Sequence, residues 1–175
     1  MSDEYSIWLL PDRDTDAYQH LSNVISEYAQ VYADAPKFEP HITVLGGIDT
    51  DIATIQNGIE DLAEEYNPIQ VIFTKAQCST TKHQCVFLLV EPTTDILSAH
   101  RTMRDICKID QGMYVPHLSL IYSEMSVTER LKITNSIDIP SFQNNIYADE
   151  IVLIDTEGDV PDWNIIQSCD LCTGR

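Results

Sequence analysis

The sequence predicts an α+β fold of two similar lobes with a cleft between them, and two observations support this prediction. A pentapeptide of the form proline, histidine, aliphatic, hydroxyl, aliphatic occurs twice, at residues 40–44 and 116–120. Strand-like and helix-like segments also follow one another in the same order in both halves of the chain. Two halves with one order and one copy of the pentapeptide each imply an approximate two-fold arrangement.

The first half alternates strand-like and helix-like segments. Residues 5–10 are mostly apolar and are followed by a proline, which is typical of a strand. Apolar side chains recur at helical spacing at 14–33 and again at 52–66. A strand is expected at 69–75, so this half runs strand, helix, pentapeptide strand, helix, strand.

The second half repeats that order. Residues 84–91 form a near-continuous apolar strand, and 94–107 have an apolar stripe at helical spacing. After the second pentapeptide, Ser126 and Glu129 form a capping box, which predicts the start of a short helix. Two further strands are expected at 151–155 and 163–171.

Each pentapeptide places a histidine and a hydroxyl on one face of its strand. Side chains two residues apart in an extended backbone point to the same side, so His41 pairs with Thr43 and His117 with Ser119. The aliphatic residues between them face the other way and anchor the strand. Two such strands facing each other would line a cleft with two imidazoles and two hydroxyls.

This set of side chains suits the opening of a cyclic phosphodiester. One neutral histidine can take the proton of an attacking water while one protonated histidine serves the leaving oxygen, and both titrate near neutrality. The hydroxyls would donate hydrogen bonds to the non-bridging phosphate oxygens. We assign His117 as the base and His41 as the acid, and the near symmetry leaves the reverse assignment open. A single copy of the motif is more often a half-buried strand histidine, but two copies favour a site.

The sequence resembles a known family at the pentapeptides and beside them. The paired motifs are similar to those of the two-histidine (2H) phosphoesterase superfamily, and the neighbouring residues resemble the cyclic phosphodiesterases of plant and yeast type. The resembling stretches lie at residues 5–11, 38–44, 84–89 and 116–122.

The resemblance implies antiparallel sheets that line a central cleft, with helices on the outside. It also implies hydrolysis of a nucleoside 2′,3′-cyclic phosphate or of ADP-ribose 1″,2″-cyclic phosphate to a phosphomonoester, with no metal and no cofactor. The alternatives are an RNA 2′,3′-cyclic phosphodiesterase or 2′-5′ RNA ligase-like enzyme of the same superfamily, a non-catalytic nucleotide-binding module, and a metal-dependent hydrolase.

Three further residues are substrate-binding candidates. In the family, the tyrosine that matches Tyr122 approaches the phosphate, although strict alternation from His117 would place it on the opposite face. Relatives carry aromatic residues suited to base stacking where this chain has Lys82 and His83, so His83 is either a stacking or phosphate contact or an ordinary loop histidine. Trp8 is either a cleft wall or part of a second core face.

The other histidines and the cysteines are not assigned to the site. His20 and His100 lie at the edge of, or on, apolar helical stripes, where packed histidines are more common than catalytic ones. Five cysteines leave one unpaired, which argues against a disulfide framework. The pair Cys169 and Cys172 has no partner pair at zinc-ribbon spacing, so no metal site is expected.

The net charge limits which partners the chain can bind, and its length indicates the number of domains. A net charge of −18 repels polyanions, so long RNA or DNA is not expected, whereas a small nucleotide held by local donors is compatible with it. The acidity is also typical of proteins adapted to high salt, or merely of an acidic cytosolic protein. The 175 residues suit a single domain of two lobes, and we expect a monomer.

The start of the chain has no basic segment, and no apolar run is long enough to cross a bilayer. We therefore expect a cytoplasmic protein with no membrane partner.

Overall fold

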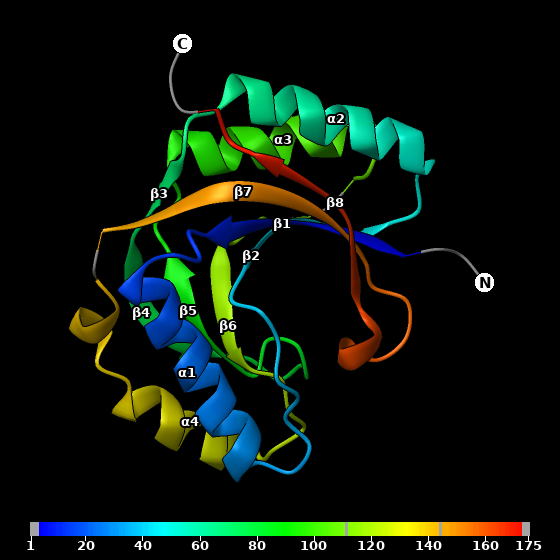
Figure 1. The fold of residues 1–175 in the computed structure, drawn as a ribbon. Coiled ribbons are helices and arrows are strands. Elements are labelled where there is room, and N and C mark those ends of the chain that lie inside the picture. Colours follow the sequence, from blue (N-terminus) through cyan, green and yellow to red (C-terminus); the bar gives the residue numbers. More distant parts are fainter. Residues whose placement is uncertain (1–3, 111, 144, 173–175) are drawn as a thin grey trace.

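The computed structural model describes residues 4–110, 112–143 and 145–172, which form one antiparallel sheet with α-helices around it (Figure 1). The strands are β1 (Tyr5–Pro11), β2 (Ile42–Ile48), β3 (Ile69–Val71), β4 (Phe73–Cys78), β5 (Val86–Val90), β6 (His117–Ile121), β7 (Ile146–Asp155) and β8 (Asn164–Asp170). The α-helices are α1 (Asp16–Val31), α2 (Ile52–Glu65), α3 (Thr94–Cys107) and α4 (Val127–Ser136), and short 3-10 turns lie at Ile139–Phe142 and Val160–Asp162. The predicted α+β class with antiparallel strands is confirmed.

The two pentapeptide strands are neighbours at the centre of the sheet. The strand order is β3-β7-β1-β2-β6-β5-β4, with β8 paired to the outer side of β7. In the described chain, β2 and β6 share a single register pair, Ile42 with Leu118. Because the pairing is so short, the two strands diverge beyond it, and the space between them opens on the face that carries the histidines.

The sheet is strongly curled. The sequence predicts one strand at 69–75, but the structure divides it into β3, which pairs with β7, and β4, which pairs with β5. These two strands lie at opposite ends of the strand order although only Ile72 separates them in the chain. The two ends of the sheet therefore come close together, and the sheet forms an almost closed barrel.

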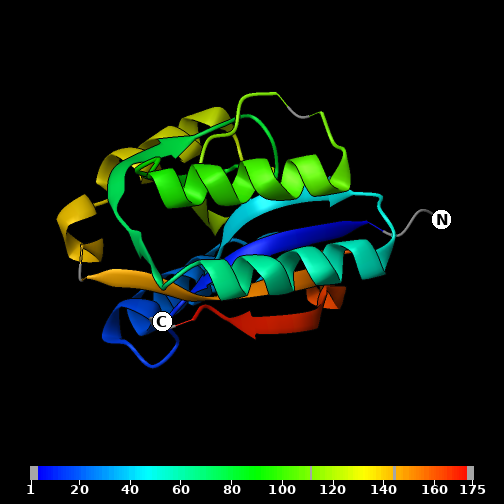
Figure 2. The ribbon, with the colours of Figure 1, turned by 90° about the horizontal axis from the view of Figure 1, so that it is seen from above.

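Each half of the chain covers the pentapeptide strand of the other half. Helix α1 packs against β6, and α3 packs against β2. Helix α2 lies beside α3 and against β7 and β8, while α4 packs on β4 and β5 (Figures 1 and 2). The predicted helix start is confirmed, because the Ser126 side chain accepts a hydrogen bond from the backbone N–H of Glu129 at the start of α4. The Glu129 carboxylate accepts from the Tyr32 hydroxyl.

The core explains why these helices form and where they dock. The apolar stripes read from the sequence are buried, with Leu21 and Ile25 of α1 and Ile55 and Ile59 of α2 almost fully covered. Burial of a side chain of this size stabilises the fold by about 1.5–3 kcal/mol. At Gly58 a Cβ atom would lie 2.9 Å from the Met103 terminal methyl, so the glycine permits the close approach of α2 and α3. No helix in the described ranges has the length and apolar character needed to cross a membrane.

Candidate active site

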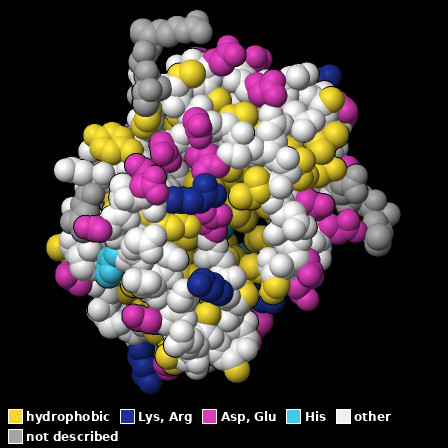
Figure 3. Space-filling model, in the orientation of Figure 1, with side chains coloured by type: hydrophobic (Ala, Val, Ile, Leu, Met, Phe, Trp, Pro, Cys, Tyr) yellow, Lys and Arg dark blue, Asp and Glu magenta, His cyan; other side chains and the backbone are white. Residues whose placement is uncertain are grey.

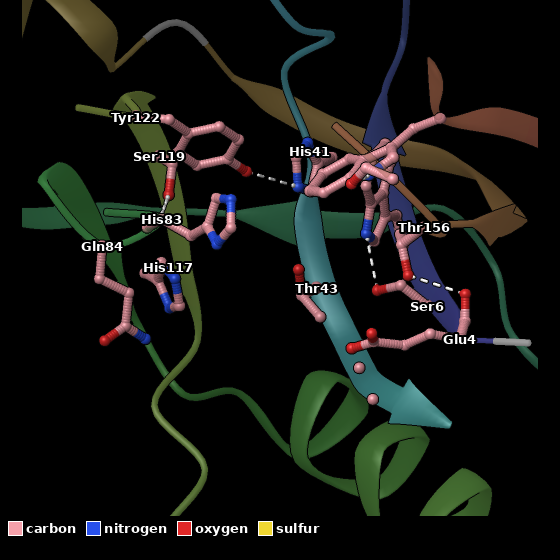
Figure 4. Close-up of a pocket in the computed structure, with 15 residues that line it drawn as sticks. Glu4, Ser6, His41, Thr43, His83, Gln84, His117, Ser119, Tyr122 and Thr156 are labelled. Atoms are coloured by element: carbon pink, nitrogen blue, oxygen red, sulfur yellow. Dashed lines mark hydrogen bonds between the residues drawn. The ribbon is translucent and has the colours of Figure 1, made fainter. Parts of the chain in front are cut away.

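The two pentapeptide histidines meet in one cavity of about 390 Å³ on the face between β2 and β6 (Figure 4). His41 and Thr43 come from the β2 side, and His117 and Ser119 come from β6. The cavity brings together all seven residues that the sequence singled out, namely Trp8, His41, Thr43, His83, His117, Ser119 and Tyr122.

Both imidazoles are held in the same way. The Nδ1 of His41 lies 2.7 Å from the carbonyl oxygen of Glu39, and the Nδ1 of His117 lies 2.9 Å from that of Val115. Because a carbonyl oxygen can only accept, Nδ1 carries the hydrogen in both rings. The neutral rings therefore keep the lone pair on Nε2, which is the nitrogen that can take a proton.

Burial lowers the pKa of both histidines. The side chain of His41 is only 5% exposed, and desolvation lowers its pKa from the ordinary 6.5 to about 4, against the opposing effect of its hydrogen bond to Glu39. A positive charge on His117 lowers the pKa of His41 further, because the two rings lie close enough to repel each other when both are protonated. Desolvation also lowers the pKa of His117, and its bond to Val115 opposes this. Near pH 7 both rings are neutral in the protein alone.

Trp8 covers one face of His41. The two rings are stacked, with centroids 3.6 Å apart and planes 13° apart. The indole Nε1 donates to the hydroxyl of Ser6 at 2.9 Å, which holds the tryptophan in place. Trp8 also packs with Leu10 and Val152 in a second apolar cluster, so it is both a cavity wall and part of a second core face.

Tyr122 reaches the cavity because β6 ends before it. Alternation stops at Ile121, the last residue of the strand, and the Tyr122 side chain turns toward the first pentapeptide. Its hydroxyl lies 3.3 Å from Nε2 of His41 and donates to that lone pair. Burial raises the pKa of the phenol above its usual range, so Tyr122 stays a hydrogen-bond donor.

The two hydroxyls differ in their present partners. Ser119 is buried, and its hydroxyl donates to the carbonyl oxygen of His83 at 3.1 Å. Within the described ranges, the Thr43 hydroxyl has no hydrogen-bond partner. Thr43 can therefore donate to an incoming anion at once, whereas Ser119 must first release the loop carbonyl.

The loop that contains His83 is anchored to the end of β6 and to α4. Arg130, only 3% exposed, donates to the carbonyl oxygens of Ser79 and Thr81. The backbone N–H of Ser123 donates to the carbonyl oxygen of Lys82. These bonds hold the loop against the cavity.

The His83 ring forms part of an aromatic end of the cavity. Its centroid lies 5.1 Å from Tyr122 in an edge-on arrangement and 5.8 Å from Trp163. Desolvation, and after it the charge of Lys82, lower the pKa of His83. The ring is thus a neutral aromatic wall near pH 7.

Several cavity residues were not found from the sequence. They are Glu4, Ser6, Gln84, Thr156 and Trp163, besides the backbone at Gly46, Gly47 and Gly158. Trp163 lies between β7 and β8 and approaches Trp8 at 5.9 Å, a contact that arises only from strand pairing. That it is one of just two tryptophans was the one available signal.

The remaining histidines lie outside the cavity. His100 is buried, as expected for a packed histidine, and its Nδ1 bonds the carbonyl oxygen of Val44 at 2.7 Å. Its ring is stacked on Tyr114, whose hydroxyl donates to the carbonyl oxygen of Thr43 at 2.8 Å. His20 lies against Phe142 on another part of the molecule. His100 and Tyr114 thus hold the backbone of the first pentapeptide from behind.

The electrostatics of the cavity are unusual for a phosphate site. No Lys or Arg lines it among the described residues, and Glu4 is its one acidic side chain. The surrounding surface is scattered with Asp and Glu, as Figure 3 shows for one face. Binding of an anion would therefore depend on neutral donors and on an imidazolium.

Comparisons with known proteins identify the family of the chain. A family model described as cyclic phosphodiesterase-like protein matches residues 1–171. The cyclic phosphodiesterase of Arabidopsis thaliana is 26% identical over 180 residues, which cover 97% of this chain and 96% of the relative. The 2′,3′-cyclic-nucleotide 3′-phosphodiesterase of Yarrowia lipolytica is 29% identical over 140 residues, 75% of this chain and 62% of the relative.

Solved structures show the same fold. LigT of E. coli in its apo form matches with a TM-score of 0.64 at 10% identity, over 98% of both chains. A protein described as a phosphoesterase matches with a TM-score of 0.63 at 13% identity, over 98% of this chain and 99% of the other. The family match over nearly the whole chain and this shared fold lead to one conclusion: the chain belongs to the cyclic phosphodiesterase-like family of 2H phosphoesterases, a family of hydrolases.

Proposed function

We propose that the chain is a metal-independent cyclic phosphodiesterase that hydrolyses a small cyclic phosphate to a phosphomonoester by two-histidine acid-base catalysis. The substrate is a nucleoside 2′,3′-cyclic phosphate or ADP-ribose 1″,2″-cyclic phosphate, and a 2′,3′-cyclic nucleotide appears in the name of the Yarrowia lipolytica relative. The main support is that two imidazoles line one cavity while both Nδ1 atoms are engaged by carbonyls, so that proton transfer falls to the two Nε2 atoms. The Nε2 of His41 accepts from the Tyr122 hydroxyl in the protein alone and exchanges this bond when it takes up a proton.

The reaction is one in-line displacement. His117 Nε2 takes a proton from water as the water oxygen forms a bond to phosphorus. The bond from phosphorus to one ring oxygen breaks, and His41 Nε2–H gives that oxygen a proton. One imidazole accepts the proton of the water and the other supplies the proton of the leaving oxygen, so both proton transfers are made by side chains of the chain.

The surroundings of the two rings support this assignment of roles. His41 must be protonated when it acts as the acid, although its pKa is low in the protein alone. The negative charge of a bound phosphate raises that pKa, and the stacked face of Trp8 stabilises an imidazolium through its π electrons. His117 is less covered than His41 and more open to an attacking water.

The neutral donors hold the phosphate. Thr43 and Ser119 donate to the non-bridging oxygens, where charge accumulates during transfer. The aromatic end formed by His83, Trp163 and Tyr122 offers ring faces for a heterocycle. An RNA end is the weaker candidate, because the chain carries a net charge of −18 and no Lys or Arg among the described residues lines the cavity itself.

The test is turnover in the presence of a chelator. The protein is incubated with adenosine 2′,3′-cyclic phosphate and EDTA, and phosphorus NMR identifies the monoester formed. We expect turnover, and we expect His41→Ala and His117→Ala each to lower kcat by about 10²–10⁴-fold. His20→Ala, outside the cavity, serves as the control with an unchanged rate, and circular dichroism checks that every variant is folded.

Two outcomes would overturn the proposal. One is a variant of either motif histidine with a near parental rate, and the other is a reaction that EDTA abolishes and a divalent cation restores. The roles are separated with a phosphodiester whose aryl leaving group needs no proton. His41→Ala should lose much less activity on it than His117→Ala, and the opposite ranking would exchange the two roles.

A further inference from the structure

The two motif histidines differ in the residue that anchors them. Each ring donates its Nδ1–H to the carbonyl oxygen of the residue two positions earlier in the chain. That residue is Glu39 at the first pentapeptide and Val115 at the second, and a proline follows it in both copies. The backbone arrangement is therefore the same, whereas one anchor carries a carboxylate and the other carries an uncharged aliphatic group.

The Glu39 carboxylate is held in place by two donors. The Nε–H of Arg13, in the turn between β1 and α1, donates to its Oε1 at 2.6 Å, and the Tyr18 hydroxyl of α1 donates to the same oxygen at 3.0 Å. The other end of the Arg13 guanidinium pairs with Glu150 of β7, and Lys37 borders the same outer hollow as Glu39. Because the Glu39 side chain is only 25% exposed, solvent screens its charge only in part.

Few groups can influence the proton on His41. Glu39 and His117 act on it by charge, and the Tyr122 hydroxyl donates to its Nε2. Burial raises the pKa of Tyr122 above its usual range and that of Tyr18 to about 12, so both phenols are neutral donors near pH 7. The Glu39 carboxylate is thus the one negative charge that acts on the His41 ring among the described residues.

The acid of the proposed reaction must carry a proton inside a buried site. Desolvation lowers the pKa of His41, and both the bond to the Glu39 carbonyl oxygen and the charge of the Glu39 carboxylate oppose this effect. For His117, burial lowers the pKa and only the bond to Val115 opposes it. A negative charge beside a buried imidazole stabilises its protonated form. The first pentapeptide is therefore suited to an imidazolium and the second to a neutral ring.

We propose that Glu39 is a positioning residue for the acid of the reaction. Its carbonyl oxygen orients the His41 ring, and its carboxylate, held by Arg13 and Tyr18, stabilises the imidazolium. Val115 orients the other ring without adding a charge. The difference between the two anchors distinguishes the roles of two histidines whose motifs are otherwise alike. This inference rests on the proposed function, because it takes from it that one histidine donates a proton.

Two variants of Glu39 separate its charge from its shape. Glu39→Gln keeps the length of the side chain and the carbonyl oxygen but removes the charge, whereas Glu39→Asp keeps the charge and shortens the side chain. Glu150→Gln is the matched control, because it removes the other carboxylate that pairs with Arg13 and lies outside the cavity. Circular dichroism checks that every variant is folded.

The measurement is kcat at saturating adenosine 2′,3′-cyclic phosphate between pH 5.5 and 8.5. At the alkaline end Glu39→Gln should lower kcat about three- to tenfold, which corresponds to a fall of about 0.5 to 1 in the pKa of His41 in the complex. The loss should disappear toward pH 5.5, where His41 of the complex is protonated in both proteins. Glu39→Asp should retain more activity than Glu39→Gln, and Glu150→Gln should match the parent.

Several results would refute the role of Glu39 and leave the proposed function standing. One is a Glu39→Gln variant that matches Glu150→Gln, or that loses the same factor at every pH, because a loss of structure does not follow the titration of one ring. Another is a lower rate for Glu39→Asp than for Glu39→Gln, since shape and not charge would then matter. A gain at acid pH in Glu39→Gln, with no loss at alkaline pH, would make His41 the base. If the parent does not hydrolyse the substrate, the proposed function fails together with this inference.

Discussion

Replacing His41 with asparagine measures what the buried imidazole costs the fold at acid pH. Asparagine keeps a donor that can reach the carbonyl oxygen of Glu39, and it does not titrate. It loses the stacking contact with Trp8, but that loss is the same at every pH. The change in stability with pH therefore isolates the proton that His41 would bind.

The size and sign of the effect follow from the pKa. Burial lowers the pKa of His41 from 6.5 in the unfolded chain to about 4 in the folded protein. Above pH 6.5 neither state binds the proton, so His41 has no effect. As the pH falls from 6.5 to 4, only the unfolded state binds it, and the free energy of unfolding falls by about 1.4 kcal/mol per pH unit, roughly 3 kcal/mol in all.

The assay is urea unfolding of both proteins at pH 7.5, 6.5, 5.5 and 4.5. The carboxylates titrate equally in both, so we plot the difference between the parent and His41→Asn. The parent should lose stability relative to the variant steadily below pH 6.5. The control is His83→Asn, at an exposed residue. The stability difference between the parent and this variant should change far less with pH. Parallel curves for the parent and His41→Asn would refute the burial argument.

Three further predictions concern the rate and the supports of the site. Burial lowers the pKa of both motif histidines, so the acid limb of the pH profile of kcat/KM, which reports the free protein, should lie below pH 6.5. The pH profile of kcat, which reports the complex, should lie at higher pH because bound phosphate favours the imidazolium. Tyr114→Phe removes the bond to the carbonyl oxygen of Thr43, and it should lower kcat about three- to tenfold. Tyr32→Phe, whose hydroxyl bonds Glu129 away from the cavity, should not. Arg130→Leu leaves four carbonyls without their donor and should lower the free energy of unfolding by about 3 kcal/mol or more in urea, whereas Arg101→Leu, at an exposed residue, should change it little.

Each of these has a contrary result. An acid limb of kcat/KM at or above pH 6.5 would show that burial does not control the histidines. A Tyr114→Phe variant that matches Tyr32→Phe in rate would show that the first pentapeptide needs no support from behind. Equal stability of the two arginine variants would show that the loop at residues 79–84 does not depend on the buried guanidinium.

Local periodicity was sufficient for part of the site. The two-residue repeat of a strand places His41 with Thr43 and His117 with Ser119, and it needs no knowledge of the rest of the fold. The apolar stripes of α1, α2 and α3 are likewise visible in the sequence, because a helix that docks on a sheet must bury one face. The same rule failed at Tyr122, which lies in the cavity because β6 ends one residue earlier.

The rest depends on pairings between distant segments. The division of residues 69–75 into β3 and β4 follows from two different partner strands, which local propensity does not specify. Trp163 reaches the cavity only because β8 pairs with β7.

The sequence by itself determined which side chains could do the chemistry, because the repeat of the pentapeptide and the alternation of a strand are local properties. Only the tertiary structure decided that both histidines open into one cavity, that Trp8 stacks on His41, that burial lowers the pKa of His41, and that His117 also borders a second hollow of about 550 Å³. The physical reason is that burial, and with it pKa and cavity shape, is set by contacts between residues far apart in the chain.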